Sequence, residues 1–185
     1  MKFLKTFLKN VGIFLGLFIL LALANRWYLG GFAKLEAKEQ NMGPYTIAYI
    51  NFTGEYGKVG PSMTKVSEVL SGAGIIYETG IGIYYDDPAT VSWTELRSDI
   101  GAVITSQDSS KLINTKEIKI KTLPAGTKIV VEFPLKNTIS YMIWPMKVYP
   151  VITKYMEAKW YKKTAMLELY DTAAKKIYYI ADIIK

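Results

Sequence analysis

Residues 81–101 read IGIYYDDPATVSWTELRSDIG, and this stretch carries the strongest signal for the fold. The apolar and aromatic residues of Ile81–Tyr85 predict a strand, and a second strand is predicted over Asp99–Thr105. Between them, the Asp-Asp-Pro segment at 86–88 predicts a turn, because proline fixes φ and the carboxylates accept hydrogen bonds from nearby backbone N–H groups. Taken alone, that segment is an ordinary strand-ending turn.

The density of matching residues in this stretch carries more information than the turn. A tyrosine pair runs into the DDP turn, and the next strand opens with LRSD, as in the GyrI-like ligand-binding domain. The matching residues are Tyr84, Tyr85, Asp86, Asp87, Pro88, Leu96, Arg97, Ser98, Asp99 and Gly101. The chain resembles this family over residues 43–185. The resemblance implies a duplicated fold that binds small molecules, as in gyrase inhibitors and the effector domains of multidrug-sensing regulators.

The rest of the chain continues the pattern of strand, helix, strand, strand. Further strands are predicted at Tyr45–Thr53, Glu117–Leu123, Lys128–Phe133, Ala165–Tyr170 and Lys176–Ile183, and helices at Pro61–Leu70 and Ile139–Ala158. Pro145 and Pro150 predict an irregular first half of the second helix. We therefore expect an α+β domain. Its two pseudo-repeated β-α-β-β halves resemble those of the GyrI-like fold, with a groove between their helices.

The first 28 residues predict a membrane anchor. An uncharged apolar run covers Val11–Ala24, and it approaches the ~20 residues needed to span a bilayer if Phe3, Phe7 and Leu8 join it. Trp27 and Tyr28 would then form an aromatic belt at the interface. A cleaved signal peptide is the alternative, since Ala22-Leu23-Ala24 fits a cleavage site.

These observations predict three segments and a location. Residues 1–28 are the anchor, 29–42 a linker and 43–185 the GyrI-like domain. We expect a single-pass membrane protein with its domain on the extracytoplasmic side, because positive charge before the apolar run slightly exceeds that after it. The charged groups compared are the N-terminus, Lys2, Lys5 and Lys9 against Arg26, Lys34 and Lys38.

Charge and composition exclude several classes of function. The formal net charge is +7, but four of the 23 basic residues lie in the first 26 positions, which contain no acid. The remaining 19 basic and 16 acidic residues form no basic block, so we expect no nucleic-acid partner. The chain has no Cys and no His. Catalytic triads with His, Cys nucleophiles and His-ligated zinc are therefore impossible within it, and we expect neither metal nor cofactor.

Glu168 is the residue around which we expect a ligand site. The period of two places Met166, Glu168 and Tyr170 on one face of their strand. Without the resemblance, Glu168 would be read as a solvent-facing residue of an edge strand, because glutamate is usually exposed. In the GyrI-like family, a glutamate of an E-x-Y pattern on the equivalent strand lies in the ligand cleft, and Glu168-Leu169-Tyr170 matches that pattern.

Aromatic and thioether side chains are the expected lining around that carboxylate, with ordinary core packing as the alternative for each. The aromatic candidates, besides Tyr170, are Tyr84, Tyr85, Trp93, Tyr141, Trp144 and Tyr149, and the methionines are Met142, Met146 and Met166. Aromatic rings offer stacking and cation–π contacts to flat or cationic ligands.

We expect binding without chemistry. The ligand would be a small aromatic or amphipathic molecule, which can be cationic, or a partner protein, held in the groove that contains Glu168. The alternative is an enzyme, because some GyrI-like proteins resemble hydrolases of strained-ring natural products. In that case Glu168 would act as the general base and Tyr170 or Trp144 would position the substrate.

Overall fold

The computed structural model describes residues 2–28, 35–135 and 145–185, and the chain divides into two compact units, residues 1–34 and 35–185. In the first unit, helix α1 covers Lys2–Tyr28. Its segment Leu4–Ala24 is 21 residues long with a mean hydropathy of 2.2, enough by length and composition to cross a membrane. A signal sequence near an N-terminus has the same properties.

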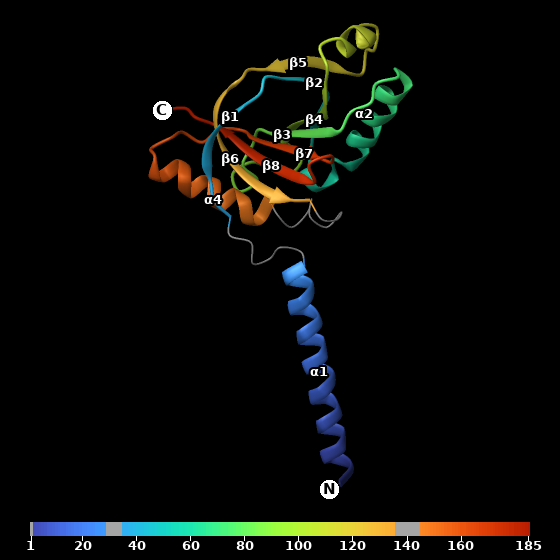
Figure 1. Ribbon diagram of the computed structural model, residues 1–185, viewed down its shortest axis with the longest axis vertical. Coiled ribbons are helices and arrows are strands. Elements are labelled where there is room, and N and C mark those ends of the chain that lie inside the picture. The colour runs from blue at the N-terminus through green and yellow to red at the C-terminus, as the bar shows by residue number, and fades with distance from the viewer. Residues whose placement is uncertain (1, 29–34, 136–144) are drawn as a thin grey trace. The chain divides into compact units, whose positions relative to one another are not determined.

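The second unit mixes helices with one antiparallel sheet (Figure 1). Its strands are β1 (Lys38–Met42), β2 (Tyr45–Thr53), β3 (Thr79–Tyr84), β4 (Arg97–Ile104), β5 (Lys119–Leu123), β6 (Gly126–Pro134), β7 (Met166–Asp171) and β8 (Lys176–Asp182). Its helices are α2 (Gly60–Gly72) and α4 (Pro145–Ala158), with short 3-10 helices η1 (Tyr56–Lys58) and η2 (Asp108–Leu112). The expected α+β class is confirmed.

The order of the strands reveals the duplication. In the described residues, the eight strands lie in the order β1-β6-β8-β7-β3-β4-β2-β5. The first half (β2, α2, β3, β4) and the second half (β6, α4, β7, β8) therefore meet at β3 and β7, each with its own strands in mirrored order. The two expected β-α-β-β halves are present, and their junction is the middle of the sheet.

Two short links force this sheet to curl. Residues 43–44 join β1 to β2, and residues 124–125 join β5 to β6, although each pair lies near opposite ends of the sheet. In a flat sheet, β1 and β2 would be six spacings apart, roughly 29 Å, whereas a two-residue link spans only about 11 Å. The ends must approach one another, and a Cβ added at Gly43 would lie 3.2 Å from the carbonyl oxygen of Pro124.

Curling gives the domain a hydrophobic core on each face of the sheet. On one face, α2 packs Val66 and Leu70 against Ala48 and Ala102. On the other face, a second cluster contains Met42, Ile47, Ile81, Ile83, Val130, Leu169 and Ile180. Alternation along each strand supplies both cores.

Helices α2 and α4 cover the same face. Ala48, Ala102, Gly80 and Tyr170 form one cross-strand row under α2. Tyr170 shares its face of β7 with Glu168, which the α4 residue Tyr149 contacts. This common surface is called the helix face below.

The structure differs from expectation at two places. β1 occupies the last part of the expected linker, residues 29–42, and its sequence KEQNM shows no strand pattern because only Met42 is buried. Pairing with β6 and the exposed Lys38–Glu132 ion pair hold it in place. The second helix is described from Pro145 and contains Pro150, while residues 139–144 of the expected range lie outside the described residues.

Candidate functional site

Glu168 lies at the centre of the sheet. A cross-strand row on the helix face runs Ile50, Ile100, Gly82, Glu168, Tyr179 and Val131. Only 2 % of Glu168 is exposed, so the reading of Glu168 as a solvent-facing residue does not fit. A carboxylate buried among apolar neighbours is costly unless polar groups surround it.

Two phenols surround the carboxylate. The Tyr149 hydroxyl donates to Oε1 of Glu168 at 2.5 Å, and the Tyr170 hydroxyl donates to Oε2 at 2.5 Å. The hydroxyls of Tyr170 and Tyr84 lie 3.3 Å apart. Glu168 and Tyr170 come from β7, Tyr149 from α4 and Tyr84 from β3, so both halves contribute to the cluster.

Burial sets the protonation of this cluster. Desolvation raises the pKa of Glu168 from 4.5 to about 7, although the hydrogen bonds from Tyr149 and Tyr170 act in the opposite direction. The pKa values of Tyr149 and Tyr170 are raised well above 10, first by burial and then by the charge of Glu168. The phenols therefore stay protonated, and only Glu168 changes its charge near neutral pH.

Gly82 makes room for the cluster. A Cβ at this position would lie 2.8 Å from the hydroxyl and ring of Tyr84. The Tyr84 ring thus lies over the backbone of its own strand, beside Glu168 on the neighbouring strand. The Tyr56 ring of η1 packs edge-on against Tyr84 with a centroid distance of 4.8 Å.

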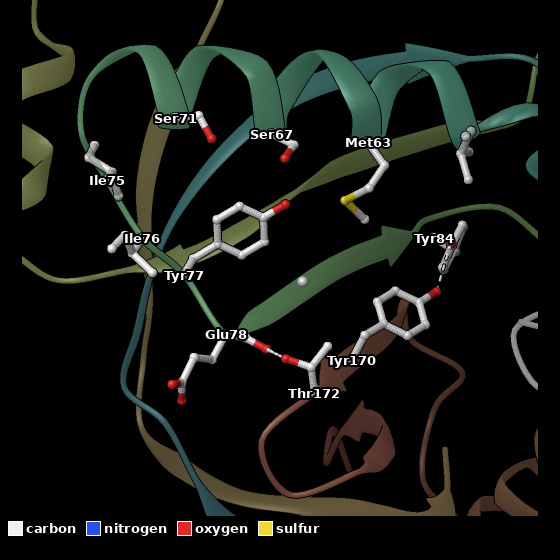
Figure 2. Close-up of a pocket in the computed structure, with 13 residues that line it drawn as sticks. Met63, Ser67, Ser71, Ile75, Ile76, Tyr77, Glu78, Tyr84, Tyr170 and Thr172 are labelled. Carbon is white, nitrogen blue, oxygen red and sulfur yellow. Dashed lines mark hydrogen bonds between the residues drawn. The ribbon is translucent and has the colours of Figure 1, made fainter. Parts of the chain in front are cut away.

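A cavity of about 660 Å³ lies between α2 and the sheet, next to this cluster (Figure 2). Figure 2 shows Met63, Ser67 and Ser71 on α2 above Tyr77 and Tyr170. The lining residues are Val59, Gly60, Met63, Ser67, Ser71, Ile75, Ile76, Tyr77, Glu78, Gly80, Tyr84, Tyr170 and Thr172. Tyr84 and Tyr170 form part of its wall, and Glu168 lies behind them.

Two buried hydroxyls on the helix face, those of Tyr179 and Ser98, were not among the expected lining residues. Tyr179 is fully buried and packs edge-on against Tyr149 at 6.1 Å. Its hydroxyl and that of Ser98 have no hydrogen-bond partner in the described part of the chain. Alternation in β8 could have placed Tyr179 with Ile177 and Ala181, but only the register with β7 places it beside Glu168.

Of the other expected lining residues, Tyr85, Trp93 and Met146 lie away from the Glu168 cluster. Tyr85 follows Tyr84, and since successive side chains alternate, its hydroxyl points to the opposite face and donates to Asp99 Oδ2 at 2.5 Å. Trp93 and Met146 are exposed, at 62 % and 80 %. Tyr141, Met142 and Trp144 lie outside the described residues. Met166 is partly buried on β7 and lies opposite Tyr84 of β3, next to the cluster.

The DDP turn and the LRSD segment are joined by hydrogen bonds between Asp86 and Arg97. Asp86 accepts hydrogen bonds from Nε (3.0 Å), Nη2 (2.7 Å) and the backbone N–H (2.7 Å) of Arg97. These bonds lower the pKa of Asp86. The Tyr56 hydroxyl contacts the carbonyl oxygens of both residues. The motif therefore fixes the loop between β3 and β4, at the end of β3 that carries Tyr84.

Comparison with known proteins establishes the family. The sequence model of the GyrI-like small molecule binding domain matches residues 36–144, more than half of the chain. The chain belongs to the GyrI-like family. The matched segment includes Tyr84 and the DDP turn, and it ends before Glu168.

Two curated relatives of this GyrI-like chain are similar in sequence. It is 26 % identical over 132 residues to the mouse testis-expressed protein 264 homolog, covering 68 % of this chain and 41 % of that protein. It is 24 % identical over 173 residues to human testis-expressed protein 264, covering 87 % and 54 %. The chain thus spans about half the length of these relatives.

Solved structures show the same fold. EcmrR, in a complex with DNA, matches the GyrI-like chain with a TM-score of 0.61 at 12 % identity, covering 96 % of this chain and 69 % of that one. The EcmrR C-terminal domain matches with a TM-score of 0.53 at 11 % identity, covering 80 % and 99 %. At these identities the likeness concerns the fold.

Proposed function

We propose that the GyrI-like domain binds a small aromatic or amphipathic molecule with a positive charge, in the groove between its two halves. The observation that carries this proposal is the buried Glu168 behind Tyr84 and Tyr170, which line a cavity of about 660 Å³. The cavity is of the size that binds drug-sized ligands. The first half supplies α2 and β3 to its wall, and the second half supplies Tyr170.

A cation in this cavity would meet favourable groups in two layers. The rings of Tyr77, Tyr84 and Tyr170 offer negative faces to a cationic ligand. Behind them, the ionised Glu168 adds an attraction that is strong because the surroundings are desolvated. The Met63 thioether adds an adaptable apolar contact.

Because the pKa of Glu168 is about 7, binding of a cation should depend on pH. The ionised form is scarce at one pH unit below that pKa and dominant at one unit above it. If the cation needs the ionised form, its apparent affinity should rise about tenfold over this interval. A neutral ligand of the same shape should show no such rise.

Thermal stabilisation measured with matched ligands tests the proposal. We expect an aromatic cation to raise the melting temperature of the parent chain more than its neutral isostere does. Glu168→Gln should remove this difference. Glu95→Gln changes the same chemical group on an exposed loop residue and should preserve it. Equal stabilisation of the parent by both compounds would contradict charge recognition, and no response to either would favour a protein partner.

A second candidate is hydrolysis with Glu168 as general base, favoured by a pKa of about 7. Tyr170 would then position the substrate. Because Tyr84 and Tyr170 line the cavity while Glu168 does not, binding alone is better supported. Turnover that persists in Glu168→Gln would remove this mechanism.

We also propose that α1 anchors the chain in a membrane as a single span, with the domain on the extracytoplasmic side. The support is the length and hydropathy of Leu4–Ala24 and the charge distribution around it. Resistance to alkaline extraction and protease sensitivity from the extracytoplasmic side are expected. Release of a shortened soluble chain would instead identify a signal peptide.

A further inference from the structure

The two halves end their helices with the same hydrogen bonds but with different residues. After α2, Ile75 N–H donates to Leu70 O at 2.9 Å and Gly74 N–H to Ser71 O at 2.9 Å. After α4, Tyr161 N–H donates to Met156 O at 2.9 Å and Trp160 N–H to Glu157 O at 3.2 Å. Both are Schellman motifs, in which the residue after the cap adopts a left-handed conformation.

Trp160 occupies the position where glycine is preferred. Its φ is 59°, close to the 66° of Gly74. A bulky side chain in this region is an uncommon and strained choice. The tryptophan gains no packing in return, because it is 89 % exposed. Neither the fold nor the Glu168 site accounts for a tryptophan here.

Lysines surround this ring. Residues 154–163 read KYMEAKWYKK, with four lysines and one glutamate. Lys154, Lys159, Lys162 and Lys163 are exposed; together with Trp160 they are called the Trp160 patch. Within the described residues, Lys163 reaches Asp87 at 3.8 Å, and the other three form no ion pair.

The neighbouring residues fix the patch to the domain. The hydroxyls of Tyr155 and Tyr161 donate to Glu39 of β1 at 3.3 and 3.0 Å, and Lys162 N–H donates to Ile184 O at 2.8 Å. The Glu39 carboxylate therefore accepts hydrogen bonds from two phenols and forms no ion pair with the lysines of the patch in the described residues. Glu157 is then the exposed acid within the segment, and the patch keeps an excess of positive charge.

We propose that the Trp160 patch binds the surface of a bilayer that contains anionic lipids. Tryptophan favours the boundary between water and hydrocarbon, and clustered lysines are attracted to anionic headgroups. An exposed ring beside exposed lysines fits a headgroup layer. The apolar Leu4–Ala24 helix gives independent support for a membrane nearby. This contact does not depend on the ligand proposed for the Glu168 site.

The chain offers a clean probe because it contains no cysteine. Ala158→Cys, at the exposed end of α4, can carry an environment-sensitive fluorophore on the complete chain in nanodiscs. In discs with about one-third phosphatidylserine, the emission maximum should shift to the blue relative to discs of phosphatidylcholine alone. Iodide should also quench the fluorescence less in the discs with phosphatidylserine. High salt should reduce the difference. Ile113→Cys, 77 % exposed after η2, is the matched control and should not respond.

Two variants identify the groups responsible. Trp160→Gly relieves the left-handed strain, so its melting temperature should not fall while the lipid-dependent shift is lost. The triple substitution Lys159→Gln, Lys162→Gln and Lys163→Gln should also abolish the shift. Identical emission in both kinds of disc, a shift that survives Trp160→Gly, or an equal response of Ile113→Cys would overturn the proposal. If single-stranded RNA, at a phosphate concentration equal to that of the lipid, completely displaces the chain's patch from the discs, the proposal is also overturned and the patch is assigned to nucleic acid.

Discussion

The two central strands of the sheet come from equivalent places in the two halves, yet they contribute opposite things to the site. β3 places Gly80 and Gly82 on the helix face, and β7 places Tyr170 and Glu168 directly opposite them. At these two pairs, β3 provides space and β7 provides hydrogen-bonding groups. A duplicated fold can therefore build an asymmetric site at its symmetric centre, because a large polar residue on one strand is accommodated by glycine on the other.

The largest expected effect concerns Glu168, on the β7 side of this comparison, and it is seen in the pH dependence of stability. Because its pKa is about 7 in the folded chain and 4.5 ordinarily, the folded state keeps a proton that the unfolded state loses between those values. The free energy of unfolding should therefore fall by about 3 kcal/mol as pH rises from 4.5 to 7, and then level off. Denaturant titrations at several pH values should show this fall in the parent and its absence in Glu168→Gln. Parallel pH profiles for both proteins would show that burial does not perturb Glu168.

A smaller effect is expected on the glycine side of the comparison. In Gly82→Ala, the new Cβ would lie 2.8 Å from the Tyr84 ring, so the ring must move. We expect a loss of about 2 kcal/mol in unfolding free energy and a weaker response to ligand. Gly80→Ala is the control, because its Cβ would meet Tyr170 at an ordinary 3.5 Å. Equal effects of the two substitutions would mean that strand propensity, and not the Tyr84 ring, determines the cost.

The smallest effect concerns the two helix caps. Trp160→Gly should stabilise the fold by about 1 kcal/mol, because glycine adopts positive φ without strain. Gly74→Ala should destabilise it by a similar amount, and since a Cβ there meets nothing within 4 Å, the cost is conformational. Thermal unfolding measures both. A destabilised Trp160→Gly variant would show that the ring contributes packing after all.

Local pattern predicted much of this fold because most strands follow the period of two. The same period placed Met166, Glu168 and Tyr170 on one face. It could not show that this face is buried, because burial depends on the cover from α2 and α4. The pairing of Gly82 with Glu168 joins residues far apart in sequence, so no local pattern contains it.

Two other features were missed by the sequence analysis, for different reasons. β1 is a strand because its backbone pairs with β6, while its side chains are mostly exposed and carry no strand signal. Tyr85 was grouped with Tyr84 as a neighbour in sequence, but alternation sends it to Asp99 on the other face. For β1, pairing between strands, which is a non-local property, decides the outcome, whereas for Tyr85 the local alternation already implies the opposite face.

The pairing of β1 with β6 also has a consequence for how the chain is made. Lys38 lies opposite Val130. Strand β1 therefore cannot pair with β6 until most of the chain has been synthesised. At about 5–20 residues per second, this delay is on the order of 5–20 s. The first half, β2 through β5, has its own strand partners and helix by then. Ribosome-bound chains should therefore fold the first half before β1 pairs with β6. The domain is complete only when the strands of the second half have added to the sheet.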